Sequence, residues 1–164
     1  MKPEILFIKY AYPCSFVLLS RKEITKKEHN LLYKSAKDEK LYLPIEKIES
    51  IFWRAMEFVG SIKNMQAVRK YWNFEHNKIL RLEKIKILDE KLFKECMIIP
   101  CEVVSVGKNN ATVKSEFFEG YINLKNDFVD VKTGDKVIKH YDYVCEKISN
   151  SLYSKMKENL RKMS

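Results

Sequence analysis

The stretch that decides the fold reads CMIIPCEVVSVGKNNATVKSEFF at residues 96–118, and VKTGDKVIKHYDYVCEKI at residues 131–148. The β-branched run at 98–106 predicts a strand, and the Gly-Lys-Asn-Asn sequence at 107–110 predicts a turn. The chain resumes as a second strand at 111–118. This part of the sequence therefore follows a strand period rather than a helical one.

The rest of this region continues the same pattern of short strands and turns. Gly120 ends the second strand, and residues 121–124 begin a third. The Thr-Gly-Asp sequence at 133–135 predicts a turn, and residues 137–145 are strand-like again. Four or five short strands with tight turns, without alternating helices, predict a small closed β-barrel of the OB-like class.

Helical patterns flank this barrel. Residues 25–28 have capping-box spacing, and residues 45–59 place their apolar side chains on one helical face, with Gly60 as a stop. A third helix is predicted at 64–77 and a short connecting helix at 88–93.

After the barrel, Ser149 or Ser151 caps a predicted C-terminal helix. The predicted fold class is therefore α+β. Residues 1–94 form an N-terminal helical domain, and residues 95–164 form a small OB-like β-barrel with a C-terminal helix.

The 164 residues carry a net charge of +9, and residues 1–95 account for +7 of it. A basic half is typical of proteins with an anionic partner such as nucleic acid. The simpler interpretation is that lysine-rich faces keep a helical domain in solution. The mixing of Lys with Glu favours the simpler interpretation.

The four cysteines are Cys14, Cys96, Cys101 and Cys145, and their spacing is not that of a secreted disulfide framework. We therefore expect reduced thiols and a cytoplasmic protein. The apolar segment at 5–19 is interrupted by a proline and is too short to span a bilayer. We expect it to be buried in the protein and predict no membrane association.

Cys96 and His140 are the residues most suited to binding chemistry. Cys96 is either a small buried side chain at a domain junction or a soft metal ligand. Cys101 is an accessory candidate, because two cysteines with the spacing of Cys96-x4-Cys101 can bind one metal ion or form a redox pair. Residues five apart on a strand face opposite sides, so joint ligation requires Pro100 to bend the chain. His140 is either a ligand or a strand-end histidine bonded to the backbone.

Other residues that commonly carry chemistry have simpler interpretations. We expect His29 and His76 to be exposed, because they lie among charged residues. We expect Cys145, Trp53 and Trp72 to be core residues. The sequence has no histidine pair with zinc spacing, no Cys-x2-Cys and no glycine-rich phosphate loop.

Residues 96–148 resemble the small hydrogenase maturation chaperones of the HypC/HupF type, and the C-terminal helix extends the resemblance to about residue 162. Members of that family have an opening cysteine, an apolar triplet, a proline and a valine-rich strand. They continue with an Ala-Thr-Val strand, a Val-Lys-x-Gly-Asp-x-Val segment, a histidine and a Glu-Lys pair. The matching residues are Cys96, Ile99, Pro100, Val103, Val104, Ala111, Thr112, Val113, Val131, Lys132, Gly134, Asp135, Val137, His140, Glu146 and Lys147.

The resemblance implies an OB-like barrel that carries a diatomic-ligated iron precursor of the nickel–iron hydrogenase active site. It implies two protein partners, a HypD-like scaffold and the hydrogenase large-subunit precursor. It assigns Cys96 to the iron and the partners, and places His140 nearby. In the family the cysteine becomes the first residue of the chain, whereas about 95 residues precede Cys96 here.

The leading hypothesis is thus a non-enzymatic assembly factor with no tightly bound cofactor, which handles a transient iron complex. The alternative is an OB-type nucleic-acid-binding protein that uses the basic N-terminal half and the aromatic side chains Phe117, Phe118 and Tyr121. A third hypothesis, a thiol-dependent enzyme, needs a base near Cys96, and His140 is the residue that the barrel offers.

Overall fold

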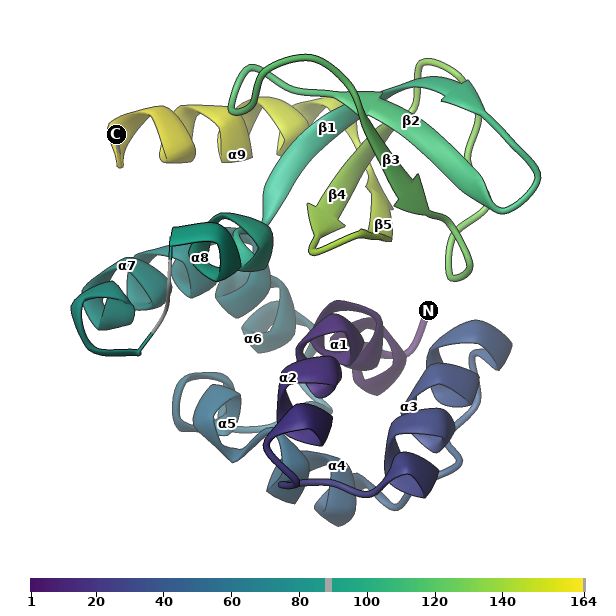
Figure 1. Ribbon diagram of the computed structural model, residues 1–164, viewed down its shortest axis with the longest axis vertical. Coiled ribbons are helices and arrows are strands. Elements are labelled where there is room, and N and C mark those ends of the chain that lie inside the picture. Colours follow the sequence, from purple (N-terminus) through teal and green to yellow (C-terminus); the bar gives the residue numbers. More distant parts are fainter. Residues whose placement is uncertain (88–89, 164) are drawn as a thin grey trace. The chain divides into compact units, whose positions relative to one another are not determined.

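The computed structural model describes residues 1–87 and 90–163; for residues 83–87 it describes the backbone alone. The chain divides into two compact units, Met1–Tyr71 and Trp72–Ser164 (Figure 1). The α+β fold class is confirmed, with helices followed by a closed five-stranded barrel and a final helix. The domain boundary predicted between residues 94 and 95 stays a prediction.

The N-terminal unit is built around α1 (Pro3–Ala11), which contacts α3 and α6. Every side chain from residue 5 to residue 11 is buried, including Lys9, whose Nζ lies 2.6 Å from Oε1 of Glu39. The predicted burial of the apolar segment is thus correct for α1, whereas Phe16 further along is 44% exposed. Among the described residues, no helix has both the length and the apolar character to cross a membrane. The other helices of the unit are η1 (Tyr12–Cys14), α2 (Ser15–Ser20), α3 (Lys26–Asp38), α4 (Ile45–Ile51), α5 (Trp53–Val59) and α6 (Met65–Lys70).

The ends of these helices follow local signals. Thr25 forms the predicted capping box with Glu28 at the start of α3. The single helix predicted at 45–59 is two helices, because Phe52 leaves helical geometry with φ −102° and ψ 37°. Gly60 ends α5 with a φ of +74°, which glycine tolerates. Trp53 is 50% exposed, so its prediction as a core residue is wrong.

His29 is buried, which corrects the expectation that it is exposed. Leu32 and Ala36 follow it at three and seven residues and are also buried, so the three side chains share one face of α3. The imidazole of His29 contacts Tyr12 Oη at 3.1 Å and Ser15 Oγ at 2.8 Å. Charged neighbours in the sequence lie on the other faces of the helix and so gave the wrong prediction.

The second unit begins with helical segments. A π-helical turn, η2 (Tyr71–Glu75), leads into α7 (His76–Ile87), and α8 (Glu90–Cys96) follows. The helix predicted at 64–77 is therefore divided among α6, η2 and the start of α7. Of the connecting helix predicted at 88–93, residues 88 and 89 lie outside the described residues, and the rest belongs to α8.

The five strands close into a barrel in the order β1-β2-β3-β5-β4. Neighbours are antiparallel except for β3 and β5, which are parallel. Alternate residues of β1, namely Ile99, Cys101 and Val103, point into the barrel core, as the two-residue period of a strand requires. This closed arrangement confirms the predicted barrel. The strands are β1 (Ile99–Val106), β2 (Asn110–Lys114), β3 (Ile122–Lys125), β4 (Lys136–His140) and β5 (Tyr143–Ile148).

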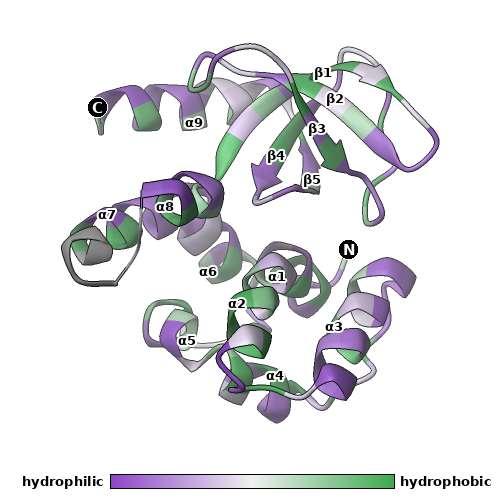
Figure 2. Ribbon diagram, in the orientation of Figure 1, coloured by the Kyte–Doolittle hydropathy of each residue, from purple (hydrophilic) through white to green (hydrophobic). Residues whose placement is uncertain are grey.

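The last helix, α9 (Asn150–Lys162), contacts β1 and β4. Of the two serines predicted as caps, Ser149 is the one that caps the helix, by accepting a 3.1 Å hydrogen bond from the Leu152 amide. Met156 and Leu160 are its buried residues, and Figure 2 shows that most of the helix is otherwise hydrophilic. The helix therefore packs through one narrow apolar face.

Candidate functional site

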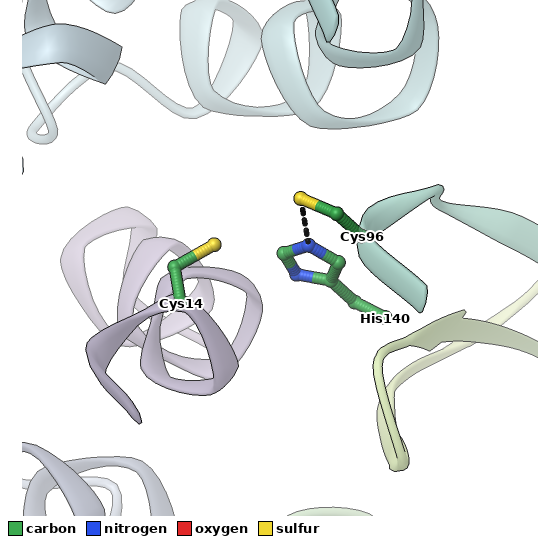
Figure 3. Close-up of side chains that lie close together, drawn as sticks. All are labelled: Cys14, Cys96 and His140. Carbon is green, nitrogen blue, oxygen red and sulfur yellow. Dashed lines mark hydrogen bonds between the residues drawn. The ribbon is translucent and has the colours of Figure 1, made fainter. Parts of the chain in front are cut away.

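Cys96 and His140, the two residues predicted to form a site, lie in direct contact. Cys96 is the last residue of α8 and His140 is the last residue of β4. The Sγ atom lies 3.7 Å from Nε2 of the imidazole, and the two side chains point toward each other (Figure 3). Both residues are buried, at 7% and 0% exposure. His140 comes 44 positions after Cys96 in the sequence, and the barrel brings the two together.

Strand register explains the contact. Ile99 on β1 pairs with Lys139 on β4, so the segment that precedes Ile99 runs beside His140. A two-residue turn follows His140, and its first residue, Tyr141, has a φ of +52°. A left-handed backbone is uncommon for tyrosine and is found disproportionately at functional sites. The turn ends β4 immediately after the histidine and so places the imidazole at the end of the barrel.

The backbone just before Cys96 is held against this turn. The carbonyl of Glu95 accepts a 2.9 Å hydrogen bond from the Tyr141 amide and a longer one, 3.5 Å, from Nζ of Lys139. Lys139 is buried, and burial lowers the pKa of its ammonium group. These bonds tie the end of α8 to both residues that flank His140.

Aromatic rings surround the His140 imidazole within the second unit. The ring centroids of Trp72, His76 and Tyr141 lie 5.7, 5.2 and 5.0 Å from that of His140. Trp72 is buried, as predicted, but His76 is also buried, which corrects the expectation that it is exposed. The sequence contains a pattern that indicates the burial of His76, because Trp72, His76 and Leu80 are spaced by four residues and so share one helical face.

Cys101, the predicted accessory thiol, lies inside the barrel rather than beside His140. It is fully buried among the core residues of β1, and its thiol donates a 3.4 Å hydrogen bond to the Ile99 carbonyl. Burial raises the pKa of Cys101 to about 12, so the thiol stays protonated at neutral pH. Pro100 lies within β1, pairs with Ile138 on β4 and accepts a hydrogen bond from Ser115 through its carbonyl. The structure gives both residues a role in packing the barrel.

The other predicted residues divide between core and surface. Cys145 on β5 is fully buried, as expected. Of the aromatic residues considered for nucleic-acid stacking, Phe117 and Phe118 are half-buried against the barrel core, and Tyr121 is 70% exposed. Cys14, which Figure 3 also draws, belongs to the N-terminal unit and ends η1.

The Cys96–His140 contact pairs a soft sulfur donor with an imidazole nitrogen. A neutral thiol donates its proton to Nε2, and a thiolate accepts a proton from an Nε2–H group. A metal at ordinary Zn–S and Zn–N bond lengths separates its two donors by about 3.1 Å at a right angle and about 3.6 Å at a tetrahedral angle. The observed 3.7 Å between Sγ and Nε2 therefore suits two neighbouring ligands of a near-tetrahedral ion. For an octahedral ion the two atoms must come a few tenths of an ångström closer together.

No protein-family model, curated protein or solved structure matches this chain. The resemblance to HypC/HupF-type chaperones therefore rests on the residues quoted for it.

Proposed function

We propose that this protein is a HypC-like, non-enzymatic assembly factor for nickel–iron hydrogenase maturation. In this proposal, the cytoplasmic protein carries an iron complex as cargo at Cys96 and His140 and has no tightly bound cofactor. Its partners are a HypD-like scaffold, which supplies the cargo, and the hydrogenase large-subunit precursor, which receives it.

The observation that carries the proposal is the 3.7 Å contact between Cys96 Sγ and His140 Nε2. A thiolate is a soft ligand that suits low-valent iron, and imidazole suits iron as a second donor. Two donors leave most coordination positions of the iron to its own diatomic ligands and to a partner protein. That is the ligand count expected of a carrier, which must release its metal, rather than of a structural site, which encloses it with four ligands.

The internal position of Cys96 changes which nitrogen is near the sulfur. A chain that begins with cysteine has an α-amine beside the thiol, but here that nitrogen is part of a peptide bond and cannot coordinate iron in its neutral form. In our proposal the imidazole of His140 supplies the nitrogen. The rings of Trp72, His76 and Tyr141 pack around this imidazole, and we propose that they limit its rotation relative to the sulfur.

Co-purification tests this function. The wild-type chain and Cys96→Ala are each co-expressed with a HypD-like scaffold and, separately, with a large-subunit precursor. Cys145→Ala is the matched control, because it removes a buried thiol that lies on β5 rather than on α8. We expect Cys96→Ala to lose both partners while its circular dichroism remains that of the wild type. Equal capture of both partners by wild type and Cys96→Ala contradicts the proposal.

A second function, thiol-dependent catalysis, is favoured by the same contact, because a nucleophilic cysteine needs a base within hydrogen-bonding reach. It requires a Cys96 thiolate that forms at a pH well below that of a free cysteine. A Cys96 thiol that titrates as an ordinary cysteine excludes this second function and leaves the carrier function unaffected.

A further inference from the structure

The side chain of Asn77 makes two hydrogen bonds to one residue of the segment that carries Cys96. Its Nδ2 donates to the Ile98 carbonyl at 2.7 Å, and its Oδ1 accepts from the Ile98 amide at 2.8 Å. Both residues are buried, at 7% and 0% exposure. Ile98 lies between the end of α8 and the start of β1. Buried backbone groups outside a helix or strand require such a partner, and here a single amide serves both of them.

Asn77 thus completes a set of bonds on both sides of Cys96. The residue before it, Glu95, is bound through its carbonyl to the Tyr141 amide next to His140. Ile98, two residues after it, is bound to Asn77 on α7. We infer that Asn77 is a positioning residue for the site, which fixes the backbone that directs the Cys96 thiol toward His140. The biological use of this role rests on the proposed carrier function.

The same amide also reaches the ring that packs against His140. Oδ1 of Asn77 lies 3.2 Å from Nδ1 of His76. The two bonds to Ile98 fix the orientation of the amide, so this oxygen faces His76 and Nδ1 is the nitrogen that carries the proton. The His76 and His140 rings meet edge to face at 5.2 Å and 74°. Asn77 therefore orients Cys96 through the backbone and supports the His140 ring through His76.

Thiol accessibility gives a direct test that needs no partner. Native protein is treated with iodoacetamide, and the alkylation rate of each cysteine is followed by peptide mass spectrometry. We compare wild type with Asn77→Ala, which removes both bonds to Ile98, and Asn77→Asp, which keeps the acceptor and removes the donor. Asn73→Ala is the control, because Asn73 is a buried asparagine one turn earlier on the same helical segment.

We expect Asn77→Ala to accelerate alkylation of Cys96 by roughly tenfold or more, the change produced by leaving a buried backbone group without its partner. The rates of Cys101 and Cys145, which lie in the barrel strands, stay within about twofold, because the local opening does not unfold the barrel. We expect Asn77→Asp to accelerate the alkylation of Cys96 by an intermediate factor. If Asn77→Ala does not fold, the rate of Cys96 alkylation in Asn77→Asp provides the test. If the carrier function is correct, both variants also capture less HypD-like scaffold than the wild type in the co-purification experiment.

Three results overturn the inference. They are an unchanged Cys96 rate in Asn77→Ala and Asn77→Asp, a parallel rise at all three buried cysteines, and an equal effect of Asn73→Ala. If the proposed carrier function is wrong but Asn77 does position Cys96, the results differ from these three. In that case wild type and Cys96→Ala capture partners equally, while the selective rise in Cys96 alkylation remains.

Discussion

Ser15→Ala removes one member of a buried hydrogen-bonded triad in the N-terminal unit, formed with Tyr12 and His29. Ser15 Oγ donates to the Tyr12 carbonyl at 2.6 Å, so it accepts the 2.8 Å bond from Nδ1 of His29. The Tyr12 hydroxyl then donates to Nε2 at 3.1 Å. In this arrangement each nitrogen of a neutral imidazole has one partner.

The magnitude follows from what the alanine leaves behind. Ser15 is 0% exposed and His29 is 7% exposed, so the Nδ1–H group of His29 loses its partner in a place that water reaches poorly. An unpaired buried donor costs about 1–3 kcal/mol. Ser20→Ala is the matched control, because Ser20 donates the same type of bond to a carbonyl three residues earlier but is exposed. We expect Ser20→Ala to change the free energy of unfolding by less than about 0.5 kcal/mol.

Urea denaturation followed by far-ultraviolet circular dichroism measures both variants. A loss of free energy of unfolding in Ser15→Ala that equals the loss in Ser20→Ala refutes the reasoning, because burial is then irrelevant to the cost of removing the hydroxyl.

The triad also predicts a pH dependence. Burial lowers the pKa of His29 from its ordinary value of 6.5. The unfolded chain therefore binds a proton at a higher pH than the folded protein does, and the stabilisation falls as pH drops from about 6.5 toward the folded-state pKa. We expect the free energy of unfolding to decrease between pH 7.5 and 5.5 more steeply in the wild type than in His29→Gln. Equal slopes in the two proteins contradict this origin of the pH dependence.

Two further predictions concern the barrel unit. Because burial raises the pKa of Cys101 to about 12, we expect iodoacetamide to alkylate it far more slowly at pH 8 than the half-buried Cys14, and comparable rates contradict the buried position. Ser149→Ala removes the cap of α9 and should cost about 1 kcal/mol in thermal denaturation, whereas Ser151→Ala, inside the same helix, should cost much less; equal costs contradict the capping role.

The sequence predicted the barrel from local signals, but the single strand expected at 137–145 is β4 and β5 with a turn between them, and the one expected at 111–118 ends at Lys114. A strand period, glycine turns and β-branched residues each identify a strand without reference to the rest of the chain. The capping box at Thr25 and the cap at Ser149 were predicted for the same reason, since each depends on residues three positions away. The resemblance implied only that His140 lies near Cys96, and the register of β1 against β4 explains the contact in the structure.

The features that the sequence analysis missed depend on long-range packing. His76 lies among polar residues, and besides the local contact with Trp72 its ring packs against that of His140, 64 residues later in the chain. The role of Asn77 depends on Ile98 in the same way. The break at Phe52 divides a helical pattern that continues without interruption in the sequence, so periodicity alone could not locate it. Trp53, beside that break, is exposed.

The proposal that Cys96 and His140 carry an iron complex is tested most directly by infrared spectroscopy of protein purified without oxygen after co-expression with a HypD-like scaffold. Diatomic ligands on iron absorb in a spectral window that is free of protein bands, so the cargo is observed directly. We expect these bands in the wild type and in Cys145→Ala, and we expect Cys96→Ala to lose them. Bands of equal intensity in wild type and Cys96→Ala, or a wild type without them, would contradict the proposal.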